Sequence, residues 1–301
     1  MTAAESRADR PPTFGILFAD RSRAALWGMA RHLREPQLSV GLIIVLAYAI
    51  VAMSAPWWVP YNPLKENLAV SLHPPSWSHL FGTDELGRDL FSRVMFGTRT
   101  SIPAALVVIL VGAGLGTALG ALAGFIGGAL DEIILRLTDM ILAFPVLVLT
   151  IAVGAAFGPS VIHGVMALIA VWWPQYVRVC RSLVLEHKNR DYVAASIAAG
   201  RREYIVLFRV ILPNVIPAIG AMAAIDVGRA ILLFSILGFV GVGARPPTPE
   251  WGSMVAEGAT VFDQWWVATF PALAILILVF AFNLIGDALR DAMDPWAAGR
   301  S

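Results

Sequence analysis

The segment Ser101–Gly124 indicates the fold class of this chain: it reads SIPAALVVILVGAGLGTALGALAG and contains no charged side chain. A helix of about 20 apolar residues crosses a bilayer core of about 30 Å. Uncharged apolar runs of this length are typical of membrane spans and are too long for most helices in soluble cores. We therefore predict that this segment is a transmembrane helix.

Other segments have the same character, in a chain that is 58% hydrophobic and only 14% charged. Soluble domains contain about 25% charged residues. The predicted spans are Ser39–Trp58, Ser101–Gly124, Thr138–Phe157, Ser160–Val177, Val215–Val240 and Val267–Gly286. The sequence thus predicts an all-α, polytopic membrane protein with six transmembrane helices.

The first apolar run begins too late, and is too long, for a cleaved signal peptide, so we interpret it as an uncleaved first span. Lys and Arg concentrate in the segments that lie inside if the N-terminus is cytoplasmic, which predicts that both termini are cytoplasmic. The predicted parts are a cytoplasmic N-terminal segment (1–38), a first transmembrane helix (39–58), an extracytoplasmic loop (59–100), a five-helix transmembrane core with a cytoplasmic loop at 186–214 (101–286), and a cytoplasmic tail (287–301).

Within the cytoplasmic loop, the stretch from 191 to 214 combines small and basic residues, which suggests a docking surface. Its Ala-rich start, Tyr192–Ala199, favours a short helix. Gly200 can end that helix in the left-handed conformation, and Pro213 suits the first turn of the next helix. Small side chains allow another protein to approach closely, and arginines add positive charge. The candidate docking residues are Tyr192, Ala194, Ala195, Ser196, Gly200, Arg201, Arg202, Arg209, Leu212 and Pro213.

Glycines recur every four residues in the second predicted span, at Gly112, Gly116, Gly120 and Gly124. Each step turns about 40° past a full helical turn, so the four form one shallow stripe. Such a stripe lets another helix approach backbone to backbone. The alternative, that glycine is simply frequent in membrane helices, stays open.

A charged motif lies in the predicted extracytoplasmic loop, where residues 81–93 read FGTDELGRDLFSR. Thr83 can cap a short helix with Asp84 and Glu85 in its first turn. Pairs at the i, i+4 spacing are Asp84–Arg88 and Asp89–Arg93. The motif predicts a capped helix that fastens the outer surface; a contact surface for an extracytoplasmic binding protein is the alternative. The candidate residues are Gly82, Thr83, Asp84, Gly87, Arg88, Asp89 and Arg93.

Several kinds of active site are excluded. The chain contains no Gly-x-x-x-x-Gly-Lys-Ser/Thr phosphate loop, no Gly-x-Ser-x-Gly elbow and no paired-His zinc motif. Its five His residues are scattered without ligand spacing, so no metal site is expected. The lone Cys180 rules out a disulfide within the chain. We therefore expect a protein that is not an enzyme and has no ATPase site of its own.

The cytoplasmic loop resembles the coupling loop of permease subunits of ABC importers. In that family the loop runs Glu-Ala-Ala, three residues, Gly, and about a dozen residues to Leu-Pro. Ala195, Gly200, Leu212 and Pro213 fall in register with it, while Ala194 stands where most members have Glu. Dipeptide permeases often have a non-acidic residue at this position, so Ala194 is consistent with the resemblance. It does argue against a docking contact that depends on a charge at residue 194.

The outer motif is similar to the Gly-Thr-Asp-x-x-Gly-Arg-Asp-x-x-Ser-Arg segment of the dipeptide, oligopeptide and nickel permease group. Residues 246–252 (PPTPEWG) and 282–295 (FNLIGDALRDAMDP) also match that group. The resemblance therefore extends from about residue 80 to 295. It is greatest to the dipeptide permease subunit of the shorter, six-span kind, which has a type I ABC importer fold.

This resemblance implies a permease subunit of an ATP-driven importer for dipeptides or short oligopeptides in the bacterial inner membrane, with its permease core at 101–286. The implied partners are a second, similar permease subunit, two ATPase domains, an extracytoplasmic substrate-binding protein and membrane lipid, but no nucleic acid. ATP and Mg²⁺ would be bound by the ATPases, and this chain would need no cofactor. The alternatives are a nickel permease of the same group and, from a different class, an ion-coupled secondary carrier.

Asp226 and Arg229 lie one helical turn apart within the fifth predicted span. Ionisable groups at membrane depth are costly and usually face the bundle interior or a water-filled cavity. A peptide has both a carboxylate and an ammonium group, so the two residues are candidates for lining a translocation path. A local i, i+3 ion pair is the other interpretation.

Overall fold

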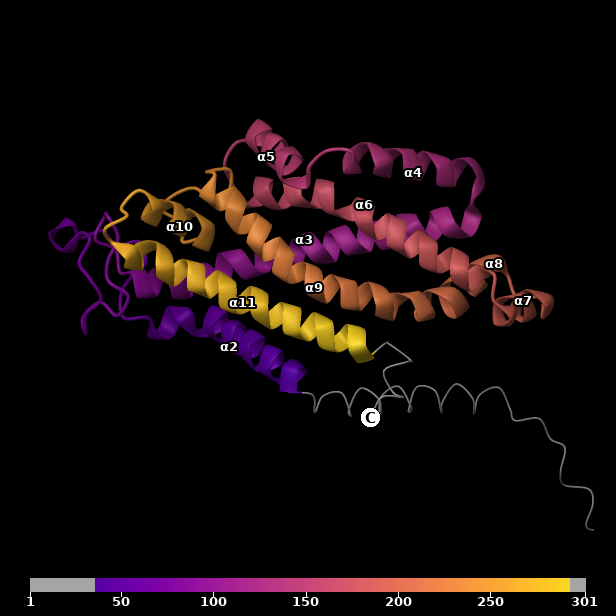
Figure 1. Cartoon of the computed structure of the whole chain (residues 1–301), viewed down its shortest axis with the longest axis horizontal. Helices are drawn as coiled ribbons and strands as arrows, with labels where there is room; N and C mark the ends of the chain where they lie inside the picture. The colour runs from indigo at the N-terminus through magenta and orange to yellow at the C-terminus, as the bar shows by residue number, and fades with distance from the viewer. Residues whose placement is uncertain (1–35, 293–301) are drawn as a thin grey trace, which may run out of the picture.

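The structure is a computed structural model that describes residues 36–292 as a long bundle of helices (Figure 1). Most of the predicted segments 1–38 and 287–301 lies outside the described residues. The longer helices are α2 (Pro36–Trp58), α3 (Leu90–Ile126), α4 (Gly128–Leu142), α5 (Val146–Phe157), α6 (Val161–Lys188), α9 (Leu212–Phe239) and α11 (Trp265–Ala292). Shorter elements are η1 (Leu68–Val70), α7 (Asp191–Ala198), α8 (Glu203–Val206), the π-helical η2 (Leu207–Ile211) and α10 (Trp251–Ala259).

The expectation of six spans is confirmed only in part. Four helical segments are long and apolar enough to cross a membrane: α2, α3, the continuous segment Glu203–Phe239, and α11. The pair α4 and α5 would supply a fifth span, although its two helices are bent by 90°. The sixth candidate, α6, is long enough, but Gln175, Arg178 and Arg181 make its second half less apolar.

The prediction of one helix over Thr138–Phe157 is wrong. Helix α4 ends at Leu142 and α5 begins after Pro145. A proline disfavours helical backbone in the residue before it, which here is Phe144. The chain therefore turns sharply at this proline, in the middle of an apolar stretch.

Helix α3 begins earlier than its apolar run. The Asp89 side chain accepts a hydrogen bond from the Ser92 backbone N–H and caps the helix, so residues 90–100 of the predicted loop are helical. Asp89 is thus the cap, and the prediction of a short helix starting at Thr83 is wrong. Thr83 instead lies in irregular backbone and forms an isolated β-bridge with Asp89.

Helices α3 and α6 share the most extensive contact in the bundle, and the glycine stripe lies between them. A Cβ atom on Gly116 would lie 2.4 Å from the Trp173 carbonyl oxygen. One on Gly120 would lie 2.5 Å from the Val177 carbonyl oxygen. Gly112 and Gly124 also face α6. The two backbones are in contact here only because these side chains are single hydrogen atoms.

The remaining long helices pack around this pair. Helix α9 contacts α3, α6 and α11, and α2 lies along α11. The short helices α7 and α8 lie at one end of the long axis, whereas α10 and the loop before α3 lie at the other (Figure 1). The two loops that the sequence analysis singled out are therefore separated by the length of the bundle.

We expect Gly116→Leu to destabilise the chain by about 3 kcal/mol or more, because the new side chain would clash with backbone that cannot move independently. Gly114→Leu is the matched control, since no atom lies within 4 Å of a Cβ placed on Gly114. The measurement is the unfolding temperature and yield of the purified variants in detergent. Equal stability of the two variants would contradict the prediction.

Candidate functional site

The loop at one end of the bundle contains two short helices, as predicted. Gly200 adopts a φ of +76° directly after α7 and its cap. Its N–H donates to the Ile197 carbonyl, and the Arg201 N–H donates to the Ser196 carbonyl, the pattern of a Schellman motif. Pro213 is the second residue of α9, but α8, η2 and α9 run on as one helical segment, so the prediction that Pro213 marks a helix start is wrong; the π-helical η2 precedes it.

This loop has an accessible surface that mixes small, basic and aromatic side chains. Ala194, Ala195, Arg201, Arg202 and Arg209 are exposed, while Leu212 and Ser196 are half-buried. The exposed large side chains are Tyr192, Ile197, Tyr204 and Phe208. Sequence analysis named only the first of these four. Ile197, Tyr204 and Phe208 could have been identified as well, because they are large apolar or aromatic residues in a segment outside the predicted spans.

The loop is fastened to the two central helices. Val193 is fully buried. The Tyr192 hydroxyl lies 2.6 Å from Nδ1 of His187 near the end of α6. The Lys188 ammonium donates to the Phe125 carbonyl at the end of α3, with an N–O distance of 2.6 Å. Tyr192 therefore joins α7 to α6, and Lys188 at the end of α6 joins that helix to α3.

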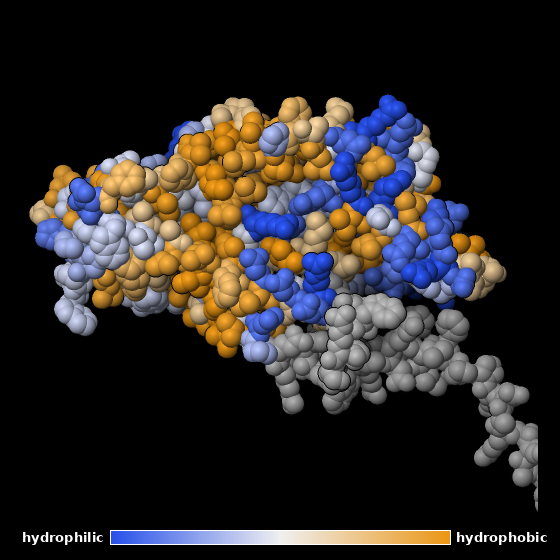
Figure 2. Space-filling model, viewed as in Figure 1, coloured by the Kyte–Doolittle hydropathy of each residue, from blue (hydrophilic) through white to orange (hydrophobic). Residues whose placement is uncertain are grey.

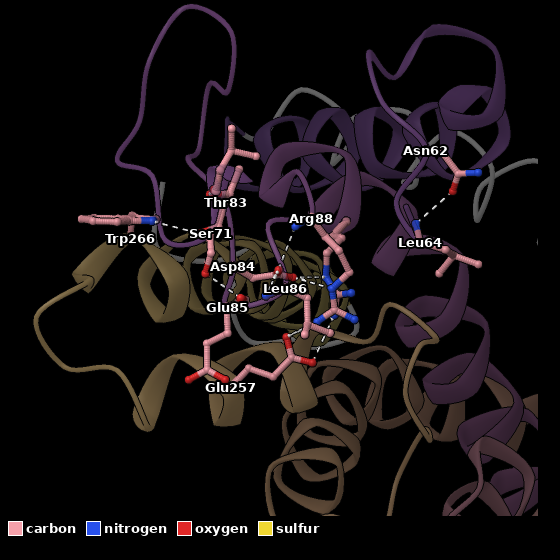
Figure 3. A network of polar contacts seen from close by, with 12 residues as sticks. Asn62, Leu64, Ser71, Thr83, Asp84, Glu85, Leu86, Arg88, Glu257 and Trp266 are labelled. Atoms are coloured by element: carbon pink, nitrogen blue, oxygen red, sulfur yellow. Dashed lines mark hydrogen bonds and ion pairs between the residues drawn. The ribbon is translucent and has the colours of Figure 1, made fainter. Parts of the chain in front are cut away.

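At the opposite end, the charged motif before α3 is folded around Asp84 (Figure 3). The Asp84 carboxylate accepts hydrogen bonds from the backbone N–H groups of Leu86 and Arg88. It also accepts one from Nε of Arg88, with an N–O distance of 2.7 Å, so the predicted i, i+4 pair is present. The two glycines of the motif adopt positive φ, +75° at Gly82 and +69° at Gly87.

Arg88 and Arg93 connect this motif to α10 through Glu257 (Figure 3). Their Nη2 atoms lie 3.1 Å and 3.2 Å from Oε2 of Glu257. Arg93 also pairs with Asp84 at 3.4 Å, so the expected pair with Asp89 is wrong. Asp89 instead caps α3 and lies 2.9 Å from Nδ1 of His79.

Four of the five charged side chains of the motif are buried and Glu85 is exposed, which favours a structural role for the motif over a contact surface. Asp84, Arg88, Asp89 and Arg93 are each at most 3% exposed. The Thr83 carbonyl accepts from the indole N–H of Trp266 at the start of α11. These side chains therefore fasten the loop before α3 to α3 itself, α10 and α11, and they are not accessible to a partner in this conformation.

We expect Glu257→Gln to destabilise the end of the bundle that contains α10 by about 2 kcal/mol, because it leaves Arg88 and Arg93 with an uncompensated positive charge. The control is Glu132→Gln on α4, where Glu132 forms an exposed i, i+4 pair with Arg136. Exposed pairs contribute about 0.3–0.5 kcal/mol. Unfolding temperatures of both variants in detergent test this, and a smaller loss for Glu257→Gln than for the control would refute it.

Glu250 caps α10 from a buried position. Its carboxylate accepts hydrogen bonds from the backbone N–H groups of Gly252 and Ser253, at 2.7 and 2.8 Å. Burial raises the pKa of Glu250 from 4.5 to about 7, although these hydrogen bonds oppose the shift. Folding therefore favours the protonated form. The stabilisation is fully present below about pH 4.5 and is lost as the pH rises through about 7.

This shift predicts that the unfolding temperature falls between pH 5 and about 7.5 in the wild type and falls less in Glu250→Gln. Glutamine is neutral at every pH and can still accept a hydrogen bond at the cap. Glu85→Gln, an exposed carboxylate at the same end, is the control that retains the wild-type pH dependence. Equal pH dependence in the wild type and Glu250→Gln would argue against the raised pKa.

In the middle of the bundle, Asp226 on α9 is fully buried and bonded to α6. Its Oδ2 atom accepts hydrogen bonds from the Tyr176 hydroxyl at 2.8 Å, the Gln175 amide at 3.1 Å and the Trp172 indole at 3.3 Å. Its Oδ1 atom lies 3.2 Å from Nη1 of Arg229. Both interpretations of the pair therefore remain, since the ion pair is local but Arg229 is exposed.

Arg229 lines a cavity of about 300 Å³ between α6, α9 and the bend that joins α4 to α5. The lining residues are Leu142, Val146, Val171, Trp172, Gln175, Arg229, Leu232 and Leu233. Figure 2 shows one face of the molecule, on which hydrophilic residues interrupt a hydrophobic middle and become denser toward the end that contains α7. The sequence identifies both charged residues, and Trp172 within the fourth predicted span can pack in the bundle or line a path, but nothing in it singles out Gln175 and Tyr176.

Comparison with known proteins shows the family of this chain. Residues 116–299 match the family described as the binding-protein-dependent transport system inner membrane component. The chain belongs to this family. This confirms the resemblance seen in the sequence, and it makes the chain a membrane component of such a transporter and not its ATPase.

Full-length relatives agree with this assignment. The chain is 43% identical to the dipeptide transport system permease protein DppC of Haemophilus influenzae, over 85% of this chain and 89% of the relative. It is 45% identical to DppC of Escherichia coli strain K12, over 85% and 88%. It is 42% identical to the di/tripeptide transport system permease protein DppC of Pseudomonas aeruginosa, over 85% and 86%.

Proposed function

We propose that this chain is a pore-forming permease subunit of an ATP-driven importer for dipeptides or short oligopeptides. The observation behind the substrate class is the similarity to dipeptide and di/tripeptide permeases over more than four-fifths of the chain. The buried polar cluster around Asp226 is compatible with it, because a peptide crossing the bilayer needs polar groups along its path.

The partners follow from the same proposal. A second, similar permease subunit completes the path, two ATPase domains dock on one side, and a binding protein delivers the peptide on the other. The Lys and Arg distribution supports an orientation in which α7 and both termini are cytoplasmic. In this orientation α6, which runs beside α3, is the additional span that brings the total to six.

The loop that contains α7 is proposed to couple ATP hydrolysis to transport. Its exposed alanines, arginines and aromatic side chains offer a docking surface, and Tyr192 bonds it to the end of α6, which Lys188 in turn bonds to α3. Closure of the ATPases would displace α7 and bias the bundle between inward and outward access. Coupling requires that the docked ATPases favour one of these two states, since equal contacts in both would shift nothing.

We expect Gly200→Trp to leave membrane insertion intact and to uncouple ATP hydrolysis from uptake. No atom lies within 4 Å of a Cβ on Gly200, so the new side chain meets no clash at its first atom, and the indole would protrude from the proposed docking surface. The measurement is uptake per ATP hydrolysed in proteoliposomes that contain the complete transporter. Wild-type uptake by this variant would show that the loop does not couple.

Gly241→Trp controls for backbone strain, because Gly241 also has a positive φ, +86°, and open space around it. It lies just after α9, at the end of the bundle opposite α7. If both variants lose coupling equally, strain at a left-handed position is the cause and docking is not.

The function as a whole is tested by purifying the tagged chain in mild detergent and identifying the retained proteins by mass spectrometry. We expect a second permease and one or two kinds of ATPase subunit. Dipeptide uptake by the reconstituted complex should require ATP. Stable recovery of this chain alone, with uptake driven by an ion gradient, would favour a secondary carrier instead.

A further inference from the structure

Two opposite charges lie side by side in the middle of the bundle, and only one of them is accessible. The Asp226 side chain is fully buried, whereas the Arg229 side chain is 66% exposed. The pair is neutral as a whole, but its orientation presents positive charge to the cavity. Among the residues that line this cavity, Arg229 is the one ionisable side chain.

The hydrogen bonds leave most of the Arg229 guanidinium available. One nitrogen, Nη1, is used by Asp226, while a guanidinium has five N–H donors in a planar fork. The other oxygen of Asp226 is held by three side chains of α6. Arg229 can therefore bind an anion without leaving the buried carboxylate unsatisfied.

The surroundings of Arg229 fit a small solute. The bend between α4 and α5 borders the cavity, since its lining includes Leu142 and Val146 on either side of the break. Broken helices at membrane depth occur where the backbone is buried in protein or lines a water-filled cavity. The Gln175 side chain adds an amide group that can hydrogen-bond a peptide unit.

We propose that Arg229 binds the carboxylate of the transported solute, so that the path selects small molecules with a free carboxylate, such as the C-terminus of a dipeptide. This inference rests on the proposed function. A guanidinium suits the role because its parallel N–H groups match the two oxygens of a carboxylate. Asp226 holds the guanidinium at the edge of the cavity.

The test compares uptake of a dipeptide and of its C-terminal amide by the complete transporter in proteoliposomes. Each peptide is supplied at a concentration that gives the binding protein equal occupancy, which removes the selectivity of that protein from the result. We expect the wild type to prefer the free acid. Arg229→Gln should lower uptake of the acid by about 10- to 100-fold and abolish the preference.

Two further variants separate binding from structure. Arg229→Lys keeps the charge but loses the planar fork, so an intermediate preference for the acid is expected. Arg136→Gln removes an exposed guanidinium from α4, away from the cavity lining, and should keep both the wild-type rate and the preference. Retention of the second permease and the ATPases by each variant is measured alongside uptake.

The results that overturn the inference are specific. If Arg229→Gln still prefers the free acid over the amide, Arg229 does not bind the carboxylate of the solute. Loss of the second permease from this variant would assign Arg229 to the interface between the permeases. A wild-type complex without ATP-dependent dipeptide uptake would contradict the proposed function itself and this inference with it.

Discussion

The backbone contact between α3 and α6 is the constraint on which the rest of this structure depends. Gly116 and Gly120 bring the two helices so close that no larger side chain fits at these positions. This contact sets how far α6 is rotated and shifted relative to α3. It therefore determines which α6 side chains face α9 and where the end of α6 presents the loop that begins at Asp191.

Helix α6 consequently contributes both to the cavity and to the end of the bundle that contains α7. Trp172, Gln175 and Tyr176 hold the buried carboxylate of Asp226, and the same helix continues to Lys188 at the loop. Pro174 lies inside the helix at the level of the cavity, and a proline there removes one backbone hydrogen bond. A movement of the loop would reach the cavity along one helix, with its natural point of bending beside Asp226.

The two ends of the bundle use charged residues in opposite ways. At the end that contains α10, Asp84, Arg88 and Arg93 are buried and join the loop before α3 to α10. At the other end, Arg201 and Arg202 are exposed on a loop that rests on a buried Val193. The first arrangement stabilises a fixed surface, and the second leaves charge available for a partner.

The sequence by itself was sufficient to predict the features that depend on neighbouring residues. These are the apolar runs of membrane length, the glycine stripe, the left-handed turn at Gly200 and the family motifs. Only the tertiary structure decided which charged residues meet. Arg93 pairs with Asp84 and Glu257 and not with Asp89, because Asp89 is used to cap α3. The hydrogen-bond donors to Asp226 lie on α6, some 50 residues earlier in the sequence. Residue spacing does not predict contacts between helices so far apart in the chain. Helix packing sets them, because a buried charge takes whichever donors the neighbouring helix presents.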